Sequence, residues 1–277
     1  MVLNYGLAIV GGGPAGIAAA IHASRLGLTT ALVEKNELGG QANIAPWIEN
    51  YPGFPDGIRG KDLISNFKDQ LAKWKVKVIS AEAVSLNLDE DVFALKTSAG
   101  DILALNIIVA TGMSPKTIGI KNEIPYADPA KTPHDGKDVL IAGGGDCAFD
   151  LAAEFALNAK SVTISMRGEK ISAIHRVAER AKKRGVRIIK NSDPTKIPYD
   201  IFISCIGKNS EVPFVQNIIK NFAGLTISPG EAKAPKGLFF AGDICRGRLR
   251  HIAIAAGDGI AAAQSAYERL KKDENNK

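Results

Sequence analysis

The chain opens on an apolar run, a glycine turn and a helix-forming stretch, and this succession constrains the fold most. Residues 7–10 read Leu-Ala-Ile-Val, residues 11–16 read Gly-Gly-Gly-Pro-Ala-Gly, and helix-forming residues continue to position 26. Gly11 permits a tight turn, Gly13 lets the backbone approach a pyrophosphate, and Gly16 lets the helix pack closely on the strand. The helix N-terminus would then meet the phosphates with unpaired N–H groups and a partial positive charge.

A second predicted strand, residues 29–33, ends in Glu34, eighteen residues after Gly16. A carboxylate at this spacing lies where the hydroxyls of an adenosine ribose are bound in dinucleotide-binding βαβ units. A glycine motif alone is more often an ordinary tight turn. With strand, helix and carboxylate in register, the stretch predicts a dinucleotide-binding unit.

The same arrangement recurs in the second half of the chain. Residues 138–141, Asp-Val-Leu-Ile, are a predicted strand, and residues 143–148, Gly-Gly-Gly-Asp-Cys-Ala, open a helix that reaches position 157. The next strand, residues 161–165, is followed by Met166-Arg167-Gly168 instead of a carboxylate. An arginine there accommodates a ribose 2′-phosphate, with Lys170 close enough to help, although a plain surface loop explains Arg167 nearly as well.

The remaining pattern predicts an α/β protein with a junction between its two nucleotide-binding units. Short alternating strands between residues 83 and 108 indicate an antiparallel meander, and a proline-bearing linker follows from residue 113 to about 136. The other predicted helices cover residues 61–73, 172–184 and 251–271, and the other strands residues 76–79, 107–112, 186–189, 200–206 and 237–244.

Composition excludes several classes of protein. A hydrophobic fraction of 45% and a charged fraction of 23% are ordinary for a globular chain, and no apolar run is long enough to cross a bilayer. The net charge of +6 favours acidic partners, but no nucleic-acid-binding signature accompanies it. Three cysteines far apart in sequence favour a reduced, cytoplasmic setting, although folding could bring two of them together.

Taken together, these motifs resemble the low-molecular-weight thioredoxin reductases and the related ferredoxin/flavodoxin-NADP reductases. Further matches are Gly39-Gly40-Gln41, residues 49–53 (Glu-Asn-Tyr-Pro-Gly), Ala110-Thr111-Gly112, Gly242-Asp243, and residues 250–257. Without the resemblance, the two loops at residues 39–41 and 49–53 are equally well read as surface loops. The resemblance implies two Rossmann-like domains, the second inserted into the first. The FAD domain covers residues 1–112 and 238–277, and the NAD(P)H domain residues 113–237.

The resemblance also implies FAD, NADPH or NADH, no metal, and a homodimer. By it, the FAD-binding residues are Gly11, Gly13, Pro14, Ala15, Gly16, Glu34, Lys35, Gly40, Gln41, Asn50, Ala110, Thr111, Gly112, Gly242, Asp243, Arg250, His251 and Ile252. The NAD(P)H-binding residues are Gly143, Gly145, Asp146, Cys147, Ala148, Arg167 and Lys170.

The chain departs from the family's disulfide reductases in one decisive place. These enzymes carry a redox Cys-x-x-Cys shortly before the second glycine motif, and residues 115–137 here contain no cysteine. The chain also keeps only one arginine of the family's His-Arg-Arg run, and its nucleotide domain is short. No residue is therefore assigned as a catalytic thiol.

These observations favour an FAD enzyme that takes hydride from NAD(P)H and hands electrons from the flavin directly to an external acceptor. A quinone, or an acidic one-electron carrier such as ferredoxin or flavodoxin, suits this chemistry and the positive charge. Two alternatives stay open. One is a disulfide reductase system in which a partner supplies the cysteine pair, and the other is a non-catalytic flavoprotein sensor or subunit.

Overall fold

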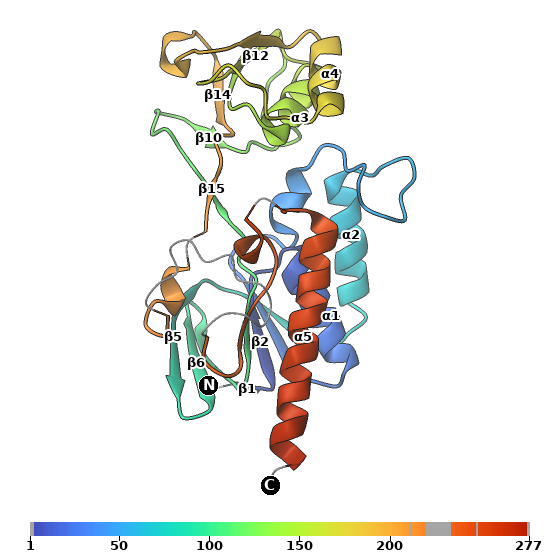
Figure 1. Ribbon diagram of the computed structural model, residues 1–277, viewed down its shortest axis with the longest axis vertical. Coiled ribbons are helices and arrows are strands. Elements are labelled where there is room, and N and C mark those ends of the chain that lie inside the picture. Colours follow the sequence, from blue (N-terminus) through green and yellow to red (C-terminus); the bar gives the residue numbers. More distant parts are fainter. Residues whose placement is uncertain (1–2, 211, 220–233, 248, 276–277) are drawn as a thin grey trace. The chain divides into compact units, whose positions relative to one another are not determined.

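The computed structural model describes residues 3–210, 212–219, 234–247 and 249–275, and it contains two compact units (Figure 1). Unit 1 comprises Met1–Asn43, Glu49–Met113 and Ser210–Lys277, and unit 2 comprises Ile44–Ile48 and Ser114–Asn209. The division differs from the expected boundaries in two places. Ile44 packs against the core of unit 2, whereas Val212, Phe214 and Val215 pack in the core of unit 1.

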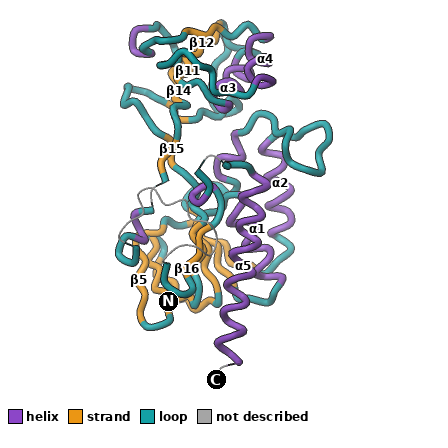
Figure 2. The backbone as a smooth tube through the Cα atoms, viewed as in Figure 1, coloured by secondary structure: helices purple, strands orange, loops and turns teal. Residues whose placement is uncertain are grey.

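A five-stranded parallel sheet forms the centre of unit 1, with the strand order β16-β8-β2-β3-β4. Its strands are β2 (Leu7–Val10), β3 (Thr30–Glu34), β4 (Val76–Ser80), β8 (Ile107–Val109) and β16 (Leu238–Phe240). The helices are α1 (Pro14–Arg25), α2 (Gly60–Leu71) and α5 (Ile252–Asn275), which run side by side in Figure 2. The chain returns from β4 to β8 on the other side of β2, so the crevice between β2 and β8 is a topological switch point.

Helices α1 and α5 approach each other very closely. A Cβ atom at Gly259 of α5 would lie 2.0 Å from the backbone oxygen of Ala15 in α1, so only glycine fits there. Alanines of both helices, including Ala19 and Ala263, pack in one core with Leu7 and Ile9 of β2. The small side chains therefore set the distance between α5 and the glycine turn at the start of α1.

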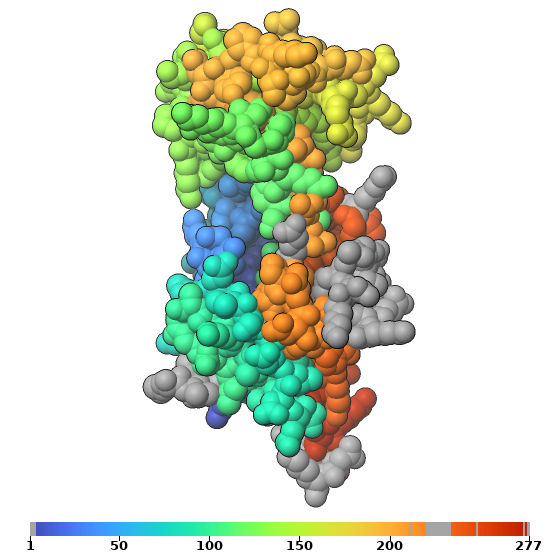
Figure 3. All heavy atoms as spheres, turned by 90° about the vertical axis from the view of Figure 1, so that its left-hand side faces the viewer, coloured from blue at the N-terminus to red at the C-terminus, as the bar shows by residue number. Residues whose placement is uncertain are grey.

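A second sheet in unit 1 contains the predicted antiparallel meander, β5 (Ala83–Asp89), β6 (Val92–Thr97) and β7 (Gly100–Ala104). Its edge strand β1 (Leu3–Tyr5), which the sequence did not predict, pairs parallel with β7. In the space-filling view, the orange residues 212–219 lie against the blue-green strands β5 and β6 (Figure 3). The 3-10 helix η3 (Pro213–Val215) inserts Phe214 and Val215 into that core.

Unit 2 repeats the parallel arrangement, with the strand order β10-β14-β11-β12-β13. Its strands are β10 (Ile124–Pro125), β11 (Asp138–Ala142), β12 (Ser161–Ser165), β13 (Arg187–Ile189) and β14 (Ile201–Ser204), and its helices are α3 (Asp146–Phe155) and α4 (His175–Lys183). A small antiparallel pair, β9 (Ser114–Pro115) and β15 (Lys208–Asn209), completes it. Here the switch point lies between β11 and β14.

Several predicted elements differ from the structure in their bounds or type. The helix expected from residue 172 begins at His175, because the N–H groups of Ser172 and Ala173 donate to the oxygen of Gly144. The strand expected over residues 237–244 is β16 alone, followed by the 3-10 helix η4 (Asp243–Cys245). The linker after residue 113 contains β9 and β10. No helix in the described part of the chain is apolar and long enough for a membrane span.

Candidate functional site

Among the glycines of the first turn, Gly11 and Gly16 are required by the fold, whereas Gly13 faces open space. Gly11 has a φ of 107°, and a Cβ atom there would lie 2.3 Å from the oxygen of Ala110. A Cβ atom at Gly16 would lie 1.8 Å from the oxygen of Gly11. A Cβ atom at Gly13 would meet nothing within 4 Å. Gly13 precedes α1 without a side-chain cap, so the N-terminal N–H groups are available to a phosphate.

The carboxylate of Glu34 is fixed beside this turn. Its Oε2 accepts a hydrogen bond of 2.6 Å from the N–H of Gly12, and its Oε1 accepts one of 2.8 Å from the N–H of Asn36. Each oxygen keeps a second lone pair that a ribose hydroxyl can use. The neighbouring Lys35 instead forms an exposed ion pair of 3.2 Å with Glu82.

Two other glycine segments lie against the same turn. A Cβ atom at Gly40, in the 3-10 helix η1 (Gly40–Ile44), would lie 3.6 Å from the Cα of Gly13. A Cβ atom at Gly242 would lie 2.9 Å from the Cβ of Ala15, next to Pro14 at the start of α1. Gly242 has a φ of 82° and precedes Asp243, the first residue of η4. The structure thus brings the predicted cofactor residues of three distant segments to one place.

The loops predicted for the flavin side are joined by side-chain hydrogen bonds within unit 1. The Nε2 of Gln41 donates to the oxygen of Met113 at 2.8 Å, just after the Ala110-Thr111-Gly112 segment that follows β8. The Nδ2 of Asn50 and the Nδ1 of His251 lie within hydrogen-bond distance, at 3.1 Å. Arg250 reaches the sulfur of Met113 at 3.3 Å, and Ile252 begins α5.

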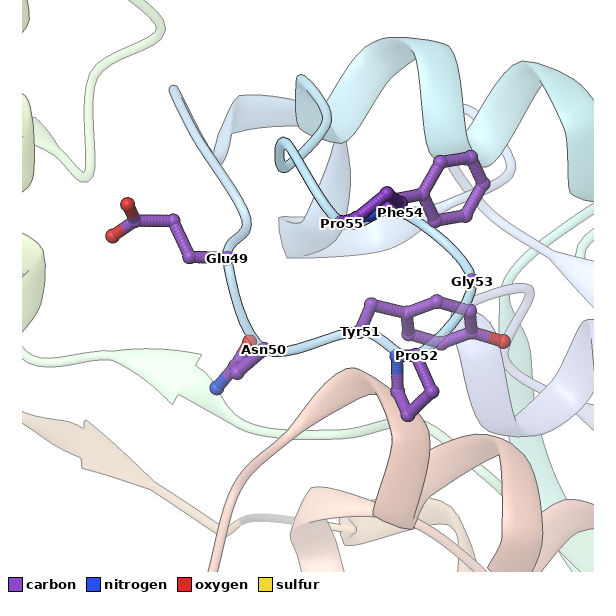
Figure 4. Close-up of a pocket in the computed structure, with 7 residues that line it drawn as sticks. All are labelled: Glu49, Asn50, Tyr51, Pro52, Gly53, Phe54 and Pro55. Carbon is purple, nitrogen blue, oxygen red and sulfur yellow. The ribbon is translucent and has the colours of Figure 1, made fainter.

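The loop from Glu49 to Pro55 lines a pocket of about 370 Å³. Figure 4 shows the rings of Tyr51 and Phe54 on one side of the loop and the side chains of Glu49 and Asn50 on the other. The Tyr51 ring lies 6.1 Å from that of Phe54 and 6.0 Å from that of Phe67 in α2. Burial raises the pKa of Tyr51 above its usual value. The aromatic contacts hold the loop so that Asn50 faces His251.

Sequence reasoning missed two residues that hold the Gly242-Asp243 turn. The carboxylate of Asp258, a residue only 4% exposed, accepts hydrogen bonds from the N–H of Gly242 at 3.3 Å and from the Nε of Arg246 at 2.8 Å. The Nη2 of Arg246 donates to its other oxygen. The only signal in the sequence was an acidic residue inside an otherwise apolar helical stretch.

The second glycine turn, in unit 2, is built like the first. Gly143 has a φ of 147°, and a Cβ atom there would lie 2.5 Å from the oxygen of Cys205. Gly145 precedes α3 without a side-chain cap, and Ala148 is fully buried. The carboxylate of Asp146 accepts a hydrogen bond of 2.7 Å from the N–H of Ile174, which joins the starts of α3 and α4.

Backbone register shows which residue of unit 2 corresponds to Glu34. The N–H of Gly11 donates to the oxygen of Val33 at 2.8 Å, and the N–H of Gly143 donates to the oxygen of Ser165 at 3.0 Å. Met166 therefore takes the place of Glu34. It is 3% exposed and packs against Gly144, whereas residues 167–170, which include Arg167 and Lys170, are exposed. Unit 2 thus presents no carboxylate at this position, and cationic side chains follow it.

The described residues hold no cluster of three or more potential metal ligands.

The structure places Cys147, part-exposed in the first turn of α3, near the buried Cys205 at the end of β14. Cys245 is buried in unit 1, where burial, then the charge of Asp258, raises its pKa to about 12. The sequence had shown all three as isolated thiols.

Comparisons with known proteins agree with this arrangement. The family described as pyridine nucleotide-disulphide oxidoreductase matches residues 5–259. The chain is 27% identical to the thioredoxin reductase of Treponema pallidum over 307 aligned positions, covering 99% of this chain and 100% of that protein. It is 28% identical to the ferredoxin–NADP reductase of Streptococcus agalactiae over 317 positions, covering 99% and 96%.

Solved structures resemble the whole chain. The thioredoxin reductase of Lactococcus lactis superposes with a TM-score of 0.87 at 26% identity, covering 97% of this chain and 99% of that one. The thioredoxin reductase of T. acidophilum gives 0.85 at 27% identity, covering 97% and 99%. The predicted fold class, α/β with two Rossmann-like dinucleotide-binding domains, is confirmed.

Proposed function

The chain belongs to the pyridine nucleotide-disulphide oxidoreductases, and we propose that it is an FAD enzyme that oxidises NADPH and passes electrons directly to an external acceptor. One observation carries this proposal. Both glycine turns are intact and differ in the residue that meets the ribose, whereas residues 115–137 contain no cysteine. The chain therefore keeps the parts that bind two nucleotides and lacks the usual dithiol between flavin and substrate.

Unit 1 fits FAD. The open space at Gly13 and the uncapped start of α1 suit a pyrophosphate, and Glu34 is held where an adenosine ribose binds. Asp243, positioned by the Gly242–Asp258 contact, suits the ribityl chain. Bound FAD supplies the ability to accept two electrons as hydride and to release them singly. The start of α5 and the Asn50–His251 pair would orient the flavin side.

Unit 2 fits NADPH better than NADH. A carboxylate on the ribose would repel a 2′-phosphate, and Met166 stands where that carboxylate would be. Arg167 and Lys170 follow on the exposed side. We expect Arg167→Ala to weaken NADPH binding by about 1.5–3 kcal/mol, the range for hydrogen bonds to charged groups, and to leave NADH binding nearly unchanged. Arg187→Ala, on the exposed side of β13, is the control.

The reverse change tests the same assignment. Met166→Glu gives unit 2 the carboxylate that Glu34 provides in unit 1. The N–H of Gly144 is available to it, because Gly144 corresponds to Gly12, whose N–H donates to Glu34. This variant should bind NADH better than NADPH. Titration calorimetry with both nucleotides measures the ratio. Equal losses for both nucleotides in Arg167→Ala, together with an unchanged ratio in Met166→Glu, would refute the site.

The acceptor is proposed to be a quinone or a small acidic one-electron carrier. The net charge of +6 speeds encounter with an acidic protein, most strongly at low salt. The relatives include a ferredoxin–NADP reductase. We expect the purified protein to be yellow, to be bleached anaerobically by NADPH, and to reduce ferricyanide and an acidic carrier. Turnover of the carrier should fall steeply as salt rises, whereas ferricyanide reduction serves as the control for flavin reduction itself.

A disulfide reductase that uses a partner's cysteines is the second candidate, because the relatives also include thioredoxin reductases. The two functions differ in their need for thiols. Replacing Cys147, Cys205 and Cys245 by serine should leave direct transfer intact. If the triple variant keeps FAD and accepts hydride but turns over no acceptor, a dithiol route through this chain's own cysteines replaces the direct one. If neither nucleotide bleaches the flavin, the protein is a sensor or subunit instead.

A further inference from the structure

Unit 2 has cysteines at the two positions where unit 1 has alanines. The glycine that opens each turn lies against the residue that follows the neighbouring strand. A Cβ atom at Gly11 would lie 2.3 Å from the oxygen of Ala110, and a Cβ atom at Gly143 would lie 2.5 Å from the oxygen of Cys205. The N–H groups of Ala110 and Cys205 each donate at 2.7 Å to the last residue of the central strand. Ala110 and Cys205 are therefore equivalent.

The second pair follows from the first. Ala15 lies four residues after Gly11, and Cys147 lies four residues after Gly143, each at the second position of its helix. Ala15 and Ala110 pack in one core cluster, and Cys147 packs against the cluster that contains Cys205. The fold thus places positions 147 and 205 side by side at the switch point between β11 and β14.

The two thiols differ in access. Cys205 is 7% exposed, and Cys147 is part-exposed at the start of α3. A hydrogen bond with the Cys147 thiol, together with burial, raises the pKa of Cys205 well above its usual value. Cys147 is therefore the thiol that a dissolved oxidant reaches, whereas Cys205 is buried and stays a neutral thiol.

We propose that Cys147 and Cys205 are an oxidation site, joined as a disulfide by hydrogen peroxide, and that this disulfide closes the nucleotide site of unit 2. The second part rests on the proposed NADPH binding. Cys147 Sγ attacks one peroxide oxygen, the O–O bond breaks, and water leaves with the thiol proton, which gives a sulfenic acid. Cys205 Sγ then attacks that sulfur, the S–O bond breaks, and a second water leaves. Two thiols and one peroxide yield one disulfide and two waters.

The disulfide acts on nucleotide binding through α3. Cys147 belongs to the first turn of α3, whose N–H groups face a bound phosphate. A bond to the end of β14 pulls this turn toward Cys205 and fills the crevice where the pyrophosphate lies. A dithiol reducing agent reverses the bond, so the affinity for the nucleotide falls when peroxide oxidises the pair and recovers on reduction.

The chain provides its own control substitutions. Cys147→Ala and Cys205→Ala introduce the residue that unit 1 carries at each equivalent position, so the variants should fold. Cys245→Ala removes a thiol of unit 1 that lies outside the pair. After peroxide treatment, intact mass should show the loss of two hydrogens in the native protein and in Cys245→Ala, but not in either variant of the pair. Peptide mapping should show a cross-link between residues 147 and 205.

Titration calorimetry then measures NADPH binding. The oxidised native protein should bind at least about tenfold more weakly, a loss of about 1.4 kcal/mol, and dithiothreitol should restore the affinity. Cys147→Ala should be insensitive to peroxide. If peroxide oxidises Cys147 to a sulfenic or sulfinic acid without a cross-link, the pair is refuted. If the cross-link forms and the affinity for NADPH is unchanged, the proposal that the disulfide closes the nucleotide site is refuted. If the reduced protein does not bind NADPH, the proposed function is refuted. The intact mass after peroxide treatment still tests whether Cys147 and Cys205 form a disulfide.

Discussion

Gly13 and Gly16 lie three residues apart, yet alanine should act on them in opposite ways. A Cβ atom at Gly16 would lie 1.8 Å from the backbone oxygen of Gly11, against at least 3.4 Å for an ordinary contact. The start of α1 would have to move off β2 by more than an ångström, and overpacking of this kind costs about 1–3 kcal/mol or more. Gly16→Ala should therefore lower the stability of the protein whether or not FAD is bound.

Gly13→Ala should spare the fold and impair the cofactor. Gly13 has a φ of −74° and a ψ of −174°, which any residue adopts, and its Cβ would meet no atom within 4 Å. The free energy of unfolding of the apoprotein should change by no more than about 0.5 kcal/mol. The new methyl group instead occupies the space proposed for the pyrophosphate, so FAD should bind at least about tenfold more weakly.

Two measurements separate the effects. Denaturant unfolding of the flavin-free proteins, followed by circular dichroism, gives the stability of each variant. Flavin absorbance after gel filtration, relative to protein absorbance, gives the occupancy. Full occupancy in Gly13→Ala would refute the pyrophosphate site. Equal destabilisation of both variants would show that Gly13 also packs against the protein.

Three further predictions concern single side chains. Asp258→Asn removes the charge that faces Arg246 and should lower stability by about 1–3 kcal/mol, measured by thermal unfolding, with a further loss of flavin occupancy; unchanged unfolding would mean that the contact is idle. Hydrogen bonds from Lys160 and then Ser161 hold the pKa of Asp138 in the folded protein below its ordinary value of 3.8. The contribution of Asp138 to the stability of the protein is therefore present above pH 3.8 and is lost as the pH falls through the lower pKa of the folded state. Asp138→Asn should flatten the acid limb of stability against pH, and an unaltered limb would contradict this. The pKa of Cys245 is raised to about 12, so a thiol reagent should not label it in the folded protein between about pH 7 and 9, whereas denaturant should expose it, as mass spectrometry can check.

The sequence alone predicted both nucleotide-binding turns, the meander and the fold class. These features are local, because a glycine turn, its strand and its helix are specified by a few consecutive residues. The resemblance added the order of the domains. It also indicated Gly40, Gln41, Asn50 and His251 as neighbours of one cofactor, and in the structure these residues do lie on loops that meet within unit 1.

Local patterns were less informative at the ends of elements. Helix α4 begins three residues late because Ser172 and Ala173 bond to Gly144, a residue 28 positions away from Ser172. Strand β1 was missed because three residues carry too little pattern, and only pairing with β7 makes them a strand. Residues 212–215 belong to unit 1 because Phe214 and Val215 pack in its core beside β5.

The sequence by itself determined that this chain has two glycine turns, one followed by a carboxylate and one by a methionine and an arginine. Only the tertiary structure decided that Asp258 holds the turn at Gly242, and that Cys147 lies beside Cys205. Strands β11 and β14 are neighbours in the sheet, yet α3, β12, α4 and β13 separate them along the chain. Contacts across a switch point join residues that no short-range pattern connects, because the order of strands in the sheet is not their order in the sequence.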